Sequence, residues 1–87
     1  MKASVIAKVY TKGESKNATV KSLKRGVEYI DAYYSAVDMA KMLLFTGWYC
    51  VSYSNPDALT HSDFENGVKF ENYSNEVLIL TLKATKK

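Results

Sequence analysis

The stretch Ser35-Ala-Val-Asp-Met-Ala-Lys-Met-Leu-Leu-Phe-Thr-Gly-Trp48 decides the fold, because it carries the signals of one amphipathic helix. At about 100° per residue, one face collects the apolar residues Ala36, Met39, Ala40, Leu43 and Leu44. Ser35 is placed to cap the first free amides, and Asp38 lies near the positive end of the helix dipole. Gly47 readily takes the left-handed conformation that ends helices. The pattern predicts a helix over residues 36–46 that packs on a sheet.

Segments rich in β-branched and aromatic residues flank this helix and predict that sheet. They are residues 3–11, 18–23, 48–53, 68–71 and 76–84. The first two form a predicted hairpin around the polar turn 12–17, and the last has apolar residues on both faces, as a central strand does. We therefore expect an α+β fold, with an antiparallel sheet of five to six strands and the 36–46 helix across one face.

Two connecting regions are less regular. Residues 27–34 contain Val, Ile and Tyr, which favours a strand that runs to the cap at Ser35. The alternative begins one longer helix, Ala32 to Thr46, from a cap at Asp31. Asn55-Pro56-Asp57 predicts a short helix over about 56–61, while Lys24-Arg25-Gly26 and Asn66-Gly67 predict turns.

The length of 87 residues indicates a single small globular domain, residues 1–87. Its predicted parts are a basic hairpin (3–23), the helix and a set of C-terminal strands (48–84). No run approaches the roughly 18 apolar residues that a membrane span requires. Cys50 is the only cysteine, which excludes an intrachain disulfide and favours a reducing, cytoplasmic setting.

Catalytic and metal-binding residue types are sparse. The chain has one histidine, His61, and one cysteine, Cys50, eleven positions apart, whereas a metal site of such ligands needs three or four. Cys50 lies mid-strand among aromatic residues, which is typical of an inert, packed thiol, and His61 lies in a polar loop. We expect no catalytic residues, no metal and no cofactor, and hence a protein that is not an enzyme.

Charge is divided unevenly along the chain. Residues 1–26 have a net charge of +6, residues 27–76 of −6 and residues 77–87 of +3. One interpretation is that these fields cancel within the fold; the other is a basic hairpin that meets phosphate. In the second case the contacting side chains are Lys8, Lys12, Lys16, Lys21, Lys24 and Arg25.

Met42 and Phe45 fall on the polar side of the helical wheel. Packing considerations favour a loop over residues 55–66 that covers them; otherwise they form an exposed apolar patch for a partner. In the exposed arrangement these two side chains are the candidate centre of a protein-binding site. Its candidate charged rim is Asp38, Asp63 and Glu65, provided that the loop folds back.

The C-terminal half resembles some small phage-encoded inhibitors of Cas nucleases, the anti-CRISPR proteins. The resemblance rests on a helix that ends in Gly47-Trp48, the stretch Phe70-Glu-Asn-Tyr73 and the closing Leu80-Thr-Leu-Lys83. It implies a phage or mobile-element accessory protein that inhibits a host defence protein, such as a nuclease or its nucleic-acid complex, by occupying a surface. Members that mimic DNA are strongly acidic, whereas this chain is net basic.

Two functional hypotheses follow. The first is a small non-enzymatic binding protein with a host protein as its partner, in the host cytoplasm. The alternative is a small nucleic-acid-binding module that uses the basic N-terminal hairpin. A homodimer is compatible with both, and neither involves a membrane.

Overall fold

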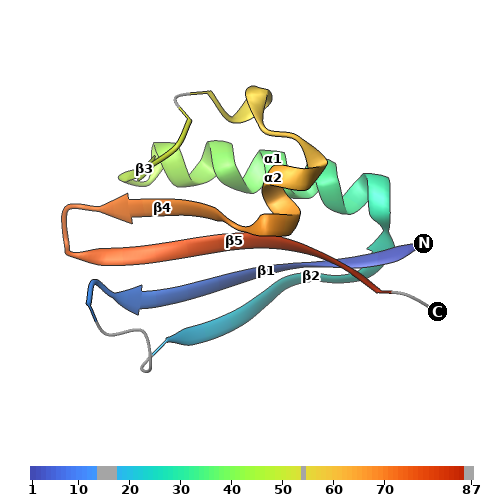
Figure 1. The fold of residues 1–87 in the computed structure, drawn as a ribbon, viewed down its shortest axis with the longest axis horizontal. Coiled ribbons are helices and arrows are strands. Elements are labelled where there is room, and N and C mark those ends of the chain that lie inside the picture. Colours follow the sequence, from blue (N-terminus) through green and yellow to red (C-terminus); the bar gives the residue numbers. More distant parts are fainter. Residues whose placement is uncertain (14–17, 54, 86–87) are drawn as a thin grey trace.

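The computed structural model describes residues 1–13, 18–53 and 55–85. Its elements, in chain order, are β1 (Lys2–Thr11), β2 (Thr19–Glu28), α1 (Tyr29–Phe45), β3 (Trp48–Cys50), the 3-10 turn η2 (Pro56–Ala58), α2 (His61–Asn66), β4 (Val68–Asn72) and β5 (Glu76–Thr85) (Figure 1). The five strands form one sheet in which every pairing is antiparallel. The predicted α+β class, with one main helix on a five-stranded sheet, is confirmed.

The sheet has the strand order β2-β1-β5-β4-β3. β5 pairs with both β1 and β4, which confirms its prediction as an interior strand. Because β2 and β3 are the two edge strands, α1 connects opposite edges of the sheet and crosses it on the way. Figure 1 shows α1 running along the strands, from a start near the N-terminus to an end on the side of the β4–β5 turn.

The helix begins earlier than the sequence predicted. α1 covers Tyr29–Phe45, so within residues 27–34 only Val27 and Glu28 are strand, as the end of β2. The alternative helix start at Ala32 lies three residues too late. Ser35 lies inside the helix and does not cap it; the N-cap position is Glu28, without a side-chain cap. Packing overrides the β-propensity of Tyr29 and its neighbours, since helical geometry buries Ala32 completely against the sheet.

The core lies between α1 and the inner face of the sheet. Ala32, Ala36 and Ala40 have no exposed surface, and their small side chains let the helix approach the strands closely. The sheet contributes alternate residues, including Val5, Leu80 and Leu82, as the two-residue period of a strand requires. Phe64 of α2 and Leu59 close the core on one side.

Three other boundaries differ from the sequence predictions. β2 continues through Lys24-Arg25-Gly26, where a turn was predicted, because two register shifts against β1 accommodate the extra residues and Gly26 takes a φ of 67°. β3 stops at Cys50. The predicted 56–61 helix is only the turn Pro56–Ala58, and the true helix, α2, is capped by Thr60.

Asn66-Gly67 does not form a hairpin turn. Gly67 instead ends α2, with a φ of 95°. Among the helices of the described residues, none is long and apolar enough to cross a membrane.

Candidate protein-binding surface

The last turn of α1 exposes two large apolar side chains. Phe45 is 87% exposed and Met42 is 61% exposed. The 55–66 segment therefore does not cover them, which corrects the packing interpretation that the sequence favoured. Thr46 ends the helix, and its backbone amide and hydroxyl donate to the carbonyl oxygens of Met42 and Leu43, at 3.1 Å each. We call Met42 and Phe45 the helix-end patch.

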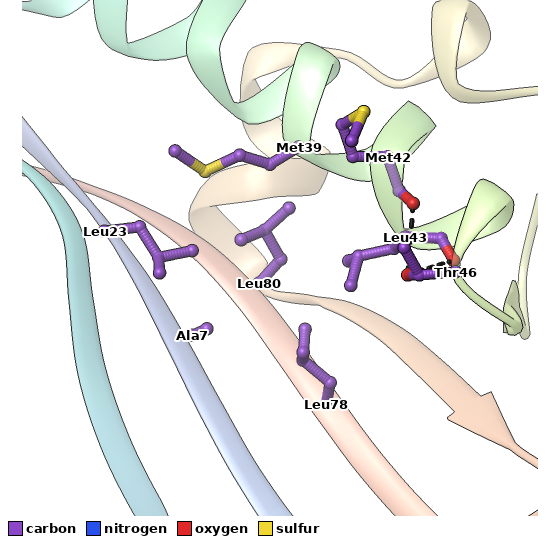
Figure 2. A pocket seen from close by; sticks show the side chains of 8 residues that line it. All are labelled: Ala7, Leu23, Met39, Met42, Leu43, Thr46, Leu78 and Leu80. Atoms are coloured by element: carbon purple, nitrogen blue, oxygen red, sulfur yellow. Dashed lines mark hydrogen bonds between the residues drawn. The ribbon is translucent and has the colours of Figure 1, made fainter.

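An apolar groove lies beside this patch, between α1 and the sheet. It has a volume of about 190 Å³ and is lined by Ala7, Leu23, Met39, Met42, Leu43, Thr46, Leu78 and Leu80. Figure 2 shows Met39 and Leu43 pointing from the helix toward the strands, while Met42 points away from the sheet at the rim. Leu78 and Leu80 of β5 form the floor and are nearly inaccessible, whereas Leu23 of the edge strand is 37% exposed. The groove is thus preformed and apolar, as ligand sites in proteins commonly are.

A second hollow lies on the other side of the patch. Lys41, Leu44, Phe45 and Pro56 line it, and its volume is about 290 Å³. Lys41 Nζ lies 3.1 Å from Asp57 Oδ1, so an ion pair connects α1 to η2 at this wall. Met42 therefore lines the groove and Phe45 lines the second hollow, so the helix-end patch borders both depressions.

Of the three acidic residues predicted as a rim, only Asp38 lies next to the patch, one helical turn before Met42. Asp38 is exposed on α1. Glu65 accepts a 2.7 Å hydrogen bond from the Tyr29 hydroxyl at the first residue of α1, sixteen positions and about 24 Å of helix before Phe45. Asp63 forms hydrogen bonds at the start of α2. Of the three predicted rim residues, only Asp38 therefore shares an element with the patch.

Asp63 helps to cap the start of α2. Its carboxylate accepts from the Thr60 backbone amide at 2.8 Å, and the Thr60 hydroxyl in turn accepts from the Asp63 amide, so the two form a capping box. The Tyr53 hydroxyl also donates to Asp63, at 3.1 Å. These hydrogen bonds, the Thr60 amide above all, hold the pKa of Asp63 below its ordinary value. Asn55, which the sequence indicates as a helix start, caps the turn η2: its side chain accepts a 3.0 Å hydrogen bond from the Asp57 amide.

The basic residues of the hairpin are spread over both sides of the sheet. Lys21 pairs with Ala7, whose side chain faces α1, whereas Lys8 pairs with Ile79 on the opposite side, and Lys24 lies on β2 between two register shifts. Lys12 is bound to Glu71 at 3.1 Å. Arg25 Nε donates to the Ser22 hydroxyl at 3.5 Å, and Lys16 lies outside the described residues. The five side chains that the structure describes do not form one patch on the hairpin.

Cys50 and His61 are separate packing residues. Cys50 is partly buried against the core. His61 packs its ring edge-on against Tyr33, with ring centroids 4.1 Å apart. In the described part of the chain, no group of three or more His, Cys, Asp and Glu side chains is arranged to hold a metal ion.

Comparison of the chain with protein-family models, with curated proteins and with solved structures found no match in any of the three. The geometry of this chain alone therefore supports the proposals below.

Proposed function

We propose that this chain is a small non-enzymatic binding protein that engages a partner protein through the helix-end patch and the adjoining groove. The observation that carries the proposal is the 87% exposure of Phe45 in a patch that borders two hollows, of which Met42 lines one and Phe45 the other. A phenyl ring buried at an interface contributes roughly 1.5–3 kcal/mol, and aromatic anchors commonly dominate binding energy.

The arrangement suits a partner whose surface is complementary in shape. The Phe45 ring projects from the surface, and the groove beside the helix-end patch can accept one apolar side chain. A cavity of about 150 Å³ holds a benzene molecule, so the groove of about 190 Å³ accommodates a Leu, Met or Phe side chain. A partner that supplies one such side chain and a pocket for the ring would bury both features together.

The rim around the patch carries charged side chains on both sides. Lys41 and Asp57 form an exposed ion pair on one side, and Lys21 of the edge strand flanks the groove on the other through its pairing with groove-lining Ala7. An apolar centre with a charged, solvated rim is the common organisation of protein interfaces. We further propose that the partner is a host protein and that binding inhibits it by occupying its surface, as expected of a phage or mobile-element accessory protein.

The test is affinity capture from host lysate with three versions of the chain: wild type, Phe45→Ala and Ile30→Ala. Ile30 is the matched control, because it is also a large apolar residue exposed on α1 (57%) but lies fifteen positions away. We expect the same protein to be enriched by wild type and Ile30→Ala and lost with Phe45→Ala. Equal enrichment by all three would reject the patch as the binding surface. Dimerisation of the purified chain that Phe45→Ala abolishes would assign the patch to self-association instead.

A further inference from the structure

The sheet face that points away from α1 is basic. Side chains alternate along each strand, so the residues opposite the core residues share this outer face. Its charged members are Lys2, Lys8, Lys69, Lys83, Glu28 and Glu71. Lys8 and Lys69 lie in one cross-strand row, each paired with Ile79. With strands about 4.8 Å apart, this row places their backbones about 10 Å from each other.

The helical layer on the other side is acidic. Asp31, Asp38, Asp57, Asp63 and Glu65 all belong to α1, η2 or α2. The only lysine in these elements is Lys41, which is paired with Asp57. Acidic residues therefore predominate in the helical layer and lysines on the outer sheet face, so an anionic partner is directed to the outer face and away from the helices.

The two carboxylates of the outer face are already occupied. Glu28 lies 3.1 Å from Lys2 Nζ at one end of the face. At the other end Glu71 accepts from Lys12 Nζ at 3.1 Å and from the Tyr49 hydroxyl at 3.2 Å. Both pairings hold the pKa of the carboxyl below its ordinary value, so the groups stay ionised and engaged. Within the described residues, no carboxylate lies within 4.0 Å of Lys8 or Lys83.

Two aromatic rings lie at the Glu71 end of the same face. Tyr49 of β3 pairs with Glu71, which places its ring on the outer face, and it is 42% exposed. Tyr73, in the turn after β4, is 95% exposed and lies against Tyr49, with ring centroids 5.9 Å apart. A tyrosine ring so exposed contributes little to the stability of the fold, but it presents a π-face on which a base can stack.

We propose that the outer sheet face binds single-stranded nucleic acid, with phosphates near Lys8, Lys69 and Lys83 and bases on Tyr73 and Tyr49. Lysines that follow a backbone and exposed aromatic rings that stack on bases are the two elements of sequence-tolerant single-strand binding. A duplex keeps its bases stacked inside, where these tyrosines cannot reach them. This proposal does not rest on the helix-end patch, which belongs to the helical layer.

The experiment measures binding of labelled oligo-deoxythymidine and oligo-uridine, about 12 nucleotides long, over a range of salt concentrations. A single fold of this size covers roughly 4 to 16 nucleotides. Binding should weaken with salt, and the double variant Lys8→Gln/Lys83→Gln should lower the logarithmic salt slope by about 1.4, since each single-strand phosphate contact contributes about 0.7. Tyr73→Ala should weaken binding about fivefold or more, because base stacking on one aromatic side chain is worth at least about 1 kcal/mol.

Three controls separate this face from other surfaces. Lys41→Gln removes one positive charge from the helical layer, and Lys21→Gln/Lys24→Gln removes two from the edge strand β2; both should leave the salt slope unchanged. Phe45→Ala should leave oligonucleotide affinity unchanged, so that this proposal and the helix-end patch succeed or fail independently.

The proposal is overturned if no oligonucleotide binds at low salt, or if Tyr73→Ala has no effect. It is also overturned if the Lys21/Lys24 variant loses more affinity than the Lys8/Lys83 variant, which would place binding on the hairpin edge. Binding to anionic lipid vesicles without binding to the oligonucleotides would likewise reject it. The substituted side chains are all exposed, and circular dichroism of each variant checks that the fold is kept.

Discussion

The hydroxyl of Tyr29 donates a 2.7 Å hydrogen bond to the carboxylate of Glu65, and this contact fixes α2 beside the start of α1. It joins two residues 36 positions apart in the chain. As a consequence, the acidic residues of α2 lie at one end of the helix and Phe45 at the other. The contact thus separates the helix-end patch from two of the residues predicted as its rim.

Titration of this tyrosine gives a first prediction. Burial raises the pKa of Tyr29 to about 12, and the hydrogen bond to Glu65 adds to the effect. Because the folded chain holds this proton more tightly than the unfolded chain, the associated stability is complete below pH 10 and is lost as the pH rises toward 12. Tyrosinate absorbance of the native protein should show a late ionisation that Tyr29→Phe removes. The same late step in the variant would assign it to another of the seven tyrosines.

Ser35→Ala tests where α1 begins. Ser35 is inside the helix, and alanine has the higher helix propensity, so the free energy of unfolding should stay equal or rise by up to about 0.5 kcal/mol. A cap at this position would instead lose about 1 kcal/mol on the same substitution. Urea unfolding followed by circular dichroism shows whether the free energy of unfolding falls or is kept. A clear loss of stability would contradict the helix start at Tyr29.

Gly67→Ala tests the close approach of the α2–β4 junction to the sheet. A Cβ at Gly67 would lie 2.9 Å from Ile79 Cγ2, and the φ of 95° is itself unfavourable for alanine. Gly47 is the matched control, since its φ is 96° and nothing lies within 4 Å of an added Cβ. Thermal unfolding should show a larger loss of stability for Gly67→Ala than for Gly47→Ala. Equal losses would mean that backbone strain alone, and not the contact with Ile79, limits the position.

The strands were predictable where alternation was regular. β1, β4 and β5 were predicted to within two residues, because their apolar residues recur with a period of two and polar turns bound them. The predicted second strand was too short, because Lys24-Arg25-Gly26 has the composition of a turn. In the structure these residues remain in β2, and register shifts against β1 accommodate them. The start of α1 was missed because the Val, Ile and Tyr residues of 27–34 have strand propensity, while the burial of Ala32 depends on contacts distant in sequence.

The candidate sites were predictable only in part. The helical wheel placed Phe45 and Met42 away from the core, but their exposure depends on the path of the 55–66 segment, which local patterns do not encode. The groove depends on the separation of α1 from the edge strand that carries Leu23. The outer-face lysines come from three different strands, so only the register of the sheet brings Lys8, Lys69 and Lys83 onto one face.

The most direct measurement compares stability with partner affinity in Phe45→Ala and Leu43→Ala. Leu43 is partly buried against the core, so Leu43→Ala should lower the free energy of unfolding by about 2 kcal/mol. Phe45→Ala leaves no cavity and should change the free energy of unfolding by less than about 0.5 kcal/mol. The same substitution should weaken the affinity for the captured partner by about 2 kcal/mol, or about 30-fold. A stable Phe45→Ala protein with a large loss of affinity is the result predicted here. A large loss of stability with affinity intact would contradict the central claim, because Phe45 would then be a core residue and not a binding residue.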